Sequence, residues 1–323
     1  MDSRYRIKPL GFEGVSTYPL SERKSKVHAG MFGKPMDGSE NILGFISKLP
    51  HILAGDGLRT LIRAILYARA TNKPIIWGLG GHVIKVGLGP VLVDLMEAGF
   101  VTGIAMNGSA AIHDFEVALA GSTSEEVEEQ IGAGRFGMAR ETGDYMNAAI
   151  TAGGSASLGM GEALGSFIAA GEQKKISFAH QDISILAQAY KQNIPATVHV
   201  AIGTDIIHAH PGASGQALGE TTYRDFRLFC TMTGELNGGG VYVNVGSAVI
   251  LPEVFLKAVS VVRTLGQPLE EFTTANLDFI QHYRPTVNVL KRPTQNSGQS
   301  VALTGHHEIM LPLIAAALKG SLG

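Results

Sequence analysis

Two short polar stretches carry the side chains best suited to chemistry. His113 and Asp114 are neighbours in the chain, and a histidine beside a carboxylate can act as a general base. Lys85 lies near the start of a predicted helix, where a cation opposes the helix dipole at a cost of about 0.3–1 kcal/mol. Because residues that break a local rule are often functional, Lys85 is a candidate for binding an anion or forming an imine. The alternatives are a capping or packed His113–Asp114 pair and a solvated Lys85.

The stretch from Pro74 to Glu116 predicts the elements that position these side chains. An apolar run ends at Gly80, a helical pattern of apolar residues ends at Gly99, and a second apolar run stops at Asn107. This pattern is typical of a βαβ unit with parallel strands. Parallel strands bring their carboxyl ends to one edge of the sheet, which is where open α/β sheets bind ligands. We therefore expect the polar stretches that follow the two strands to meet at one site.

The rest of the chain alternates helix and strand patterns. Helices are expected within residues 42–70, 138–149, 160–170, 184–193, 223–233, 252–265 and 309–318, and strands within 197–202, 241–246, 272–276 and 286–290. Ser124 is the expected N-cap of a further helix, and residues 152–155 are expected to form a loop. The alternation predicts an α/β fold, a Rossmann-like, mostly parallel sheet with helices on both faces. Residues 1–41 are expected to form an N-terminal arm, and residues 42–323 a single α/β domain.

A glycine turn and two histidine pairs suggest ligands. The turn Gly78-x-Gly80-Gly81 opens a helix and suits a phosphate, but it lacks the GxGxxG spacing, and a turn without a ligand fits equally well. His208-Ala209-His210 and His306-His307-Glu308 could hold a metal, or bind a substrate or nucleotide instead. Because Cys, Asp and Glu partners at typical spacings are missing, we predict no metal site.

Composition excludes several classes of protein. The formal charge of −2 gives no electrostatic footprint for nucleic acid. Cys230 is the single cysteine of the 323 residues, so no intrachain disulfide can form, and a reducing compartment is the natural expectation. The N-terminus lacks the apolar region of a signal peptide, and no apolar run is long enough for a membrane span. We expect a cytoplasmic protein with a small-molecule substrate. The arm and the small-residue helices within 148–170 favour a homo-oligomer, most simply a tetramer.

Taken in order, five stretches resemble the deoxyhypusine synthase family at remote similarity, over about residues 40–318. Residues 80–88 are similar to the NAD loop and first helix of that family, and residues 106–114 to its threonine-alanine-glycine-glycine segment. Residues 184–205 are similar to its helix, strand and threonine–aspartate pair, residues 237–241 to its glycine-rich segment, and residues 306–313 to its final segment.

The resemblance implies a fold, a cofactor and an activity. The fold would be an NAD-binding sheet in a homotetramer with sites at subunit interfaces. The activity would be that of an NAD-dependent transferase, which moves an aminobutyl group from spermidine to a lysine of a translation factor through an imine. Carried over position by position, the NAD contacts would be Gly80, Gly81, His82, Asn107, Gly108, Ser109, Asp205, Gly239, Gly305 and His306.

The chain departs from that family at its substrate site. Ile112 and His113 replace a glutamate pair, and no tryptophan-glycine-lysine segment is found, which leaves Lys291 as a second candidate for the imine. Burying an ammonium without an anionic partner costs several kcal/mol, so we expect an acidic or zwitterionic ligand rather than a polyamine. The sequence predicts an NAD-binding enzyme for an amine or amino-acid-like substrate. The alternatives are a histidine-based hydrolase or lyase, with or without a metal, and a non-catalytic nucleotide-binding scaffold.

Overall fold

Six parallel strands form one sheet in the computed structural model, which describes residues 4–171, 173 and 176–322. The strands are β1 (Ile75–Leu79), β2 (Gly103–Asn107), β3 (Ala196–His199), β4 (Val241–Val245), β5 (Thr273–Asp278) and β6 (Gln299–Thr304). Their order is β3-β2-β1-β4-β5-β6, and every neighbouring pair is parallel. The chain order reverses beside β1, so the carboxyl ends of β1 and β4 form the topological switch point where such sheets bind ligands.

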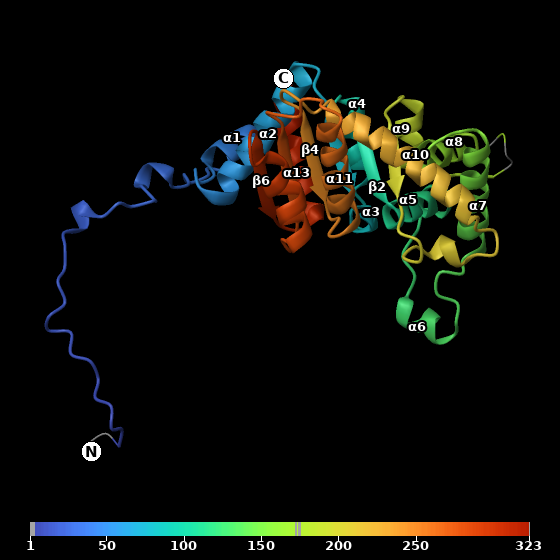
Figure 1. Cartoon of the computed structure of the whole chain (residues 1–323). Coiled ribbons are helices and arrows are strands. Elements are labelled where there is room, and N and C mark those ends of the chain that lie inside the picture. Colours follow the sequence, from blue (N-terminus) through green and yellow to red (C-terminus); the bar gives the residue numbers. More distant parts are fainter. Residues whose placement is uncertain (1–3, 172, 174–175, 323) are drawn as a thin grey trace.

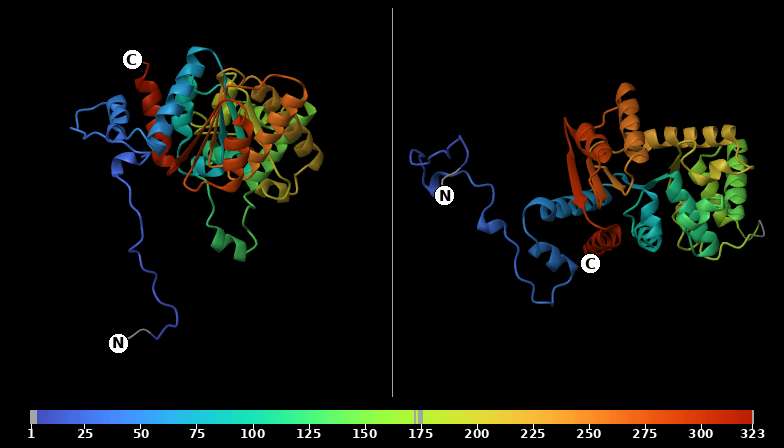
Figure 2. Two further views of the ribbon diagram at one scale, coloured as in Figure 1. Left: turned by 60° about the vertical axis from the view of Figure 1, so that its left-hand side comes forward. Right: turned by 90° about the horizontal axis from the view of Figure 1, so that it is seen from below.

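Helices cover both faces of the sheet, which confirms the predicted fold class (Figures 1 and 2). One face packs against α2 (Leu53–Ala70), α4 (Gly89–Glu97), α5 (Gly108–Ala120), α9 (Ile185–Lys191) and α13 (His307–Gly320). The other face packs against α10 (Gly215–Gly234), α11 (Ile250–Thr264) and the π-helical segment η4 (Pro285–Lys291). Helices α7 (Arg140–Ser155) and α8 (Met160–Ala169) extend the body beyond the β3 edge of the sheet (Figure 1).

The alternation of side chains along β1 shows how the two layers are held. Trp77 is fully buried on the α2 face, and its indole N–H donates to the carbonyl oxygen of Phe100 at 3.0 Å. On the opposite face the ring of Tyr242 stacks on Phe255 with 4.0 Å between ring centroids. Gly78 leaves the space for that tyrosine, because a Cβ at Gly78 would lie 2.5 Å from its hydroxyl oxygen. Strand β1 is therefore apolar at nearly every position, as expected for a central parallel strand.

Two predicted elements have different bounds. The helix after β1 is divided at residues 86–88 into α3 (Gly81–Lys85) and α4, so Lys85 lies at the end of a five-residue helix. The expectation that Lys85 opposes the dipole of a long helix is therefore wrong. Residues 152–155 belong to α7, and the chain leaves that helix only at Ala156, with Ser157 in the left-handed region at φ 60°.

Two further segments have a different type of structure from the one predicted. Ser124 caps no helix, because α6 (Val127–Gly132) begins three residues later and Ser124 has a φ of 74°. Residues 286–290 are mostly β-branched or apolar, but they lie within η4, where Val289 and Leu290 pack against the α11 face of the sheet. The last strand is β6 instead. Its polar positions are exposed because it lies at the edge of the sheet.

Two segments project from the body (Figure 1). Residues 122–139, which we call the lobe, carry α6 and leave the carboxyl edge of the sheet between α5 and α7. The arm carries η1 (Leu20–Glu22) and η2 (Ala29–Met31) and runs away from the body, and the first three of its residues lie outside the described part of the chain. The short elements η3 (Ile206–Ala209) and α12 (Arg292–Thr294) belong to the body.

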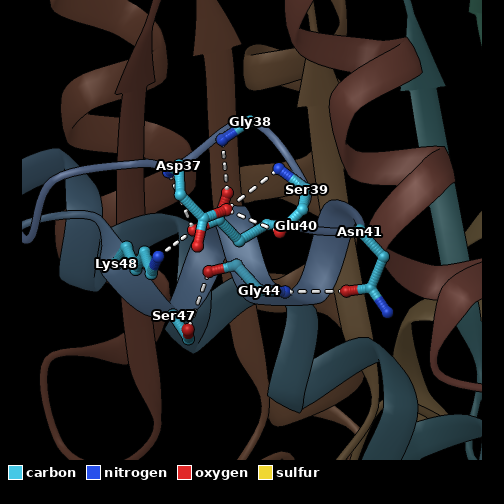
Figure 3. Close-up of polar contacts among 8 residues, drawn as sticks. All are labelled: Asp37, Gly38, Ser39, Glu40, Asn41, Gly44, Ser47 and Lys48. Atoms are coloured by element: carbon cyan, nitrogen blue, oxygen red, sulfur yellow. Dashed lines mark hydrogen bonds and ion pairs between the residues drawn. The ribbon is translucent and has the colours of Figure 1, made fainter.

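The arm is anchored where it joins α1 (Ile42–Lys48) (Figure 3). Asn41 caps α1 by accepting from the backbone N–H of Gly44 at 2.9 Å, and Glu40 pairs with Lys48. Glu40 also accepts from the backbone N–H of Gly38 at 3.1 Å. The junction is thus fixed by hydrogen bonds although the arm beyond it is exposed.

Among the described helices, none combines the length and apolarity that a membrane span needs.

Candidate functional site

A cavity of about 190 Å³ lies at the carboxyl edge of the sheet, beside the foot of the lobe. Lys85, Ser109, His113 and Asp205, four of the residues predicted from the sequence, line it together. Glu116 lines it as well. Ser109, His113 and Glu116 are spaced by four and three residues along α5, so they share one face of that helix. The expectation that the polar stretches after β1 and β2 meet therefore holds for Lys85, Ser109 and His113.

His113 is hydrogen-bonded to Glu116 through a threonine. Its Nδ1 lies 2.6 Å from Oγ1 of Thr123, and that hydroxyl donates to Oε2 of Glu116. The hydroxyl of Thr142 donates to Oε1 of the same carboxylate at 3.0 Å. Burial alone would raise the pKa of Glu116, but the nearby His113 imidazole and the hydrogen bonds from Thr123 and Thr142 outweigh burial and hold that pKa below its ordinary value. Glu116 is therefore ionised near neutral pH.

Asp205 lies against the first turn of α5. A Cβ at Gly108 would fall 2.2 Å from Oδ2 of Asp205, so a glycine is needed for this close approach. The Asp205 side chain is 7% exposed, and its Oδ2 has no hydrogen-bond partner within the described part of the chain. Burial raises the pKa of Asp205 to about 6, although a hydrogen bond from Thr204 opposes the shift. Nε2 of His208, 3.9 Å away, is too distant to satisfy the carboxylate.

The lining of the cavity is more acidic than we expected from the replacement of the family's glutamate pair by Ile112 and His113. Three carboxylates, those of Glu116, Glu125 and Asp205, line it beside the single ammonium group of Lys85. Glu125 comes from the lobe, where it accepts from the backbone N–H of Gly137 at 3.0 Å. An amine or a zwitterion matches this balance better than a purely acidic ligand, because each buried ammonium needs an anionic partner.

Asp114 does not line the cavity, although it follows His113 directly. Its side chain is buried and points to the start of α9, where it accepts from the hydroxyl of Ser184 at 2.7 Å and from the backbone N–H groups of Ile185 at 2.7 Å and Leu186 at 3.1 Å. Burial raises the pKa of Asp114 to about 6, against the effect of those three hydrogen bonds. The structure therefore places Asp114 in a helix cap rather than beside His113 as an acid or base.

A second group of residues lies at the switch point. Gly80 donates its backbone N–H to the carbonyl of Val245 at 2.9 Å, and a Cβ at Gly80 would meet the carbonyl oxygen of Gly246 at 2.1 Å. The ends of β1 and β4 therefore touch. His307 lies beside Gly246, is only 1% exposed, and has no hydrogen-bond partner for either ring nitrogen within the described residues. Burial lowers the pKa of His307, although the nearby carboxylate of Asp278 opposes the shift.

Exposed rings cover His307 and form with it what we call the ring cluster, which consists of His82, Phe279, His306 and His307. The rings of Phe279 and His306 are stacked, with 6.3 Å between centroids and 5° between planes. The ring of His82 lies 5.7 Å from that of His307, edge to face. Phe279 is 47% exposed and the side chain of His306 is 68% exposed, so the stack faces solvent.

The ring cluster and the cavity adjoin each other through α3. A Cβ at Gly81 would lie 2.2 Å from Oγ of Ser109 and 3.2 Å from Cδ2 of His113, so the start of α3 packs directly on the cavity wall. His82, one residue later, belongs to the ring cluster, and Lys85 at the other end of α3 lines the cavity. One short helix thus contributes a side chain to each part of the site.

Three of the predicted positions have other roles. Gly239 precedes β4 and lines a different cavity with Tyr67, at the amino end of the sheet. Lys291 is exposed at the end of η4, where the chain returns toward the amino end of β6. The side chain of Asn107 caps α5 by accepting from the backbone N–H of Ala110 at 2.9 Å. Gly305 follows β6 and lies beside the ring cluster at the carboxyl edge.

The histidine pairs do not assemble a metal site. His208 faces Asp205, whereas His210 is buried with its Nε2 2.9 Å from the carbonyl oxygen of Gly137. Within the described residues no group of three His, Cys, Asp or Glu side chains could hold a metal ion. Sequence reasoning missed Glu116, although its helical spacing from Ser109 and His113 was a usable signal. It also missed Phe279 and the burial of His307, for which the sequence offers no signal.

Comparison with known proteins shows a relationship of fold. No protein-family model matches the chain, and no curated protein matches it in sequence. A protein of Methanococcus maripaludis S2 assigned to the LOR/SDH proteins is 18% identical with a TM-score of 0.51, over 82% of this chain and 70% of that one. AgrE, in a ternary complex with ornithine and NAD⁺, is 12% identical with a TM-score of 0.52, over 85% of this chain.

This chain spans about a third of the length of AgrE and of the cyanobacterial arginine dihydrolase ArgZ. A protein of Entamoeba histolytica assigned as a deoxyhypusine synthase is 13% identical with a TM-score of 0.49, over 89% of this chain and 96% of that one. The parallel α/β fold predicted from the sequence is confirmed, and the chain shares it with the Methanococcus protein and with AgrE.

Proposed function

We propose that the ring cluster binds a nicotinamide dinucleotide and that the adjoining cavity holds the substrate of an NAD-dependent enzyme. The observation that carries this proposal is His307, a buried imidazole at the switch point that has no hydrogen-bond partner among the described residues and lies beneath the exposed Phe279–His306 stack. A buried polar group without a partner calls for a ligand or water, and exposed rings can stack on a nucleotide base. AgrE, which shares the fold, was solved with NAD⁺ and ornithine, which supports the proposal.

The residues at the carboxyl edge fit a dinucleotide, although they differ from the usual Rossmann dinucleotide site. The GxGxxG fingerprint is absent, and Asn107 at the end of β2 is used as a helix cap instead of contacting a ribose. The N-terminus of α13, whose N-cap His306 makes no side-chain cap bond, has free backbone N–H groups that favour a phosphate. Gly305, which is half-buried, directly precedes this N-cap. When bound, NAD would accept or return a hydride.

The cavity fits an amine or an amino-acid-like substrate. Asp205 and Glu125 offer carboxylates to an ammonium group, and Lys85 offers a cation to a carboxylate. If the reaction is a transfer through an imine, the imine would form on Lys85, because Lys291 is exposed at the end of η4, outside the cavity lining. A hydrolase or lyase without cofactor would use the same cavity, and a scaffold would bind the nucleotide without reaction. Nucleotide binding therefore has to be measured first.

Calorimetric titration with NAD⁺ and NADH tests the proposal. The parent protein is expected to bind, and His307→Gln to bind at least about tenfold more weakly, a loss of about 1.4 kcal/mol. His180→Gln is the matched control, because His180 is exposed in the segment before α9, against the carboxyl end of α5 and outside the ring cluster. Neither heat nor a thermal shift with millimolar nucleotide would refute dinucleotide binding. Equal affinity in His307→Gln would refute the assigned place.

A further inference from the structure

The carboxylate of Glu116 is held between two hydroxyl groups, one from the start of the lobe and one from just after its end. Thr123 precedes the lobe's helix α6, and Thr142 lies in the first turn of α7, just after the lobe. Thr123 donates to Oε2 of Glu116, and Thr142 donates to Oε1 at 3.0 Å. Both carboxylate oxygens therefore act as acceptors, as an ionised carboxylate does.

The hydrogen bond between Thr123 and Glu116 fixes the tautomer of His113. A threonine hydroxyl has one proton, and that of Thr123 is used toward Glu116. The contact of 2.6 Å between Thr123 Oγ1 and His113 Nδ1 must then be donated by the histidine. In its neutral form His113 thus carries its proton on Nδ1. In that form its Nε2, which makes no hydrogen bond within the described part of the chain, has a free lone pair on a residue that lines the cavity.

We propose that Glu116 and Thr123 are positioning residues that hold His113 as the proton acceptor of the cavity, acting on a substrate ammonium group. The chain Glu116–Thr123–His113 orients the imidazole and stabilises the imidazolium, the role a directly bonded carboxylate has beside a catalytic histidine. In the step, a substrate N–H bond breaks, its electrons remain on the substrate nitrogen, and the proton binds Nε2 of His113. The substrate class rests on the proposed function, whereas the tautomer does not.

The other charges of the cavity are consistent with an ammonium substrate. Asp205 from the loop after β3 and Glu125 from the lobe are anionic, and Lys85 from α3 is the one cation among the groups that line the described cavity. The unpartnered Oδ2 of Asp205 is free to accept from such a ligand. A neutral amine, once formed, has the lone pair that it needs to release a hydride to NAD⁺, so proton removal would prepare the substrate for the proposed reaction.

The tautomer can be read by ¹⁵N NMR of histidine-labelled protein without any cofactor. The signals of His113 are assigned by their loss in His113→Gln. We expect Nδ1 protonated and Nε2 unprotonated in the parent, retention of this pattern in Thr123→Ser, and its loss in Thr123→Val and Glu116→Gln. A parent protein with the proton on Nε2 overturns the proposal, and so does a Thr123→Val protein that keeps the parent tautomer. If Thr123→Val does not fold, the parent and Thr123→Ser spectra still decide.

The substrate class is tested in the same spectra with L-ornithine, its decarboxylated analogue putrescine and the diacid glutarate as probes. We expect the two amines to shift the His113 signals in the parent, and glutarate to leave them unchanged. A response to glutarate alone would overturn the assignment of an ammonium substrate. Because these spectra need no NAD, their failure is distinguishable from failure of the calorimetric titration, which reports on the dinucleotide alone.

Discussion

Replacing Asp114 by alanine tests whether this residue is a helix cap or an acid/base group. The substitution leaves the backbone N–H groups of Ile185 and Leu186 buried without an acceptor, at about 1–3 kcal/mol each. It also removes a carboxylate whose ionisation burial disfavours, because its pKa is raised from 3.8 to about 6. That rise corresponds to about 3 kcal/mol. Loss of the acceptor lowers the stability of the variant, whereas removal of a carboxylate that is costly to ionise raises it. The second effect grows as the pH rises through the pKa of Asp114.

The sign of the pH dependence follows from the raised pKa. Between 3.8 and about 6 the folded protein binds more protons at Asp114 than the unfolded chain does, so this contribution to stability is complete below that window and is lost as the pH rises through it. Asp114→Ala lacks the contribution. We expect the variant to be less stable than the parent by about 3 kcal/mol near pH 4, and the difference to shrink by up to about 3 kcal/mol near pH 8.

Urea unfolding of both proteins across this pH range measures the difference directly. Subtracting variant from parent cancels the titration of other buried carboxylates, such as Asp205 and Asp225. Asp144→Ala, which removes an exposed carboxylate from α7, should show no such trend. A difference that is flat with pH, or a variant as stable as the parent near pH 4, would refute the cap and return Asp114 to the candidates for catalysis.

Three further outcomes are expected. Gly80→Ala should destabilise the protein and abolish NAD binding, because the added Cβ would lie 2.1 Å from the backbone oxygen of Gly246. Gly219→Ala is the control: its Cβ would meet nothing within 4 Å, so this variant should stabilise α10 by about 0.5–1 kcal/mol in thermal unfolding. Glu116→Gln should speed hydrogen exchange in the lobe, and unchanged exchange would show that Glu116 does not hold it. Residues 1–27 carry exposed large apolar side chains, and deleting them should reduce the mass of the oligomer measured by light scattering. The unfolding temperature of the body should not fall. An oligomer that keeps the same number of subunits would contradict assembly through the arm.

The fold was predictable where the pattern of apolar residues in the sequence matches the pattern of buried residues in the structure. The βαβ unit from Pro74 to Glu116 could be read because β1 and β2 are buried on both faces and the intervening glycines end each element. The last crossover could not be read in the same way. Residues 286–290 have the composition of a strand but pack as a π-helix, and the edge strand β6 has polar, exposed positions that resemble a loop. Local composition there is overridden by tertiary packing.

The site was predictable only in part, since sequence adjacency does not determine where side chains point. His113 and Asp114 are neighbours, but successive residues of a helix point about 100° apart, so one lines the cavity and the other caps α9. The partner of His113 is Glu116, three residues on and one threonine away in space. The conformation of the lobe, which brings Thr123 to Glu116 and Glu125 to the cavity, has no periodic pattern from which it could be inferred.

A crystal structure of the protein with NAD⁺ and L-ornithine tests the central claim most directly. The account predicts the dinucleotide at the carboxyl ends of β1 and β4, with a base against the Phe279–His306 stack and a hydrogen bond to His307. It predicts ornithine in the cavity, with its amino group between Asp205 and Nε2 of His113. Dinucleotide bound at the amino end of the sheet, or ornithine bound with its carboxylate toward Asp205, would contradict it.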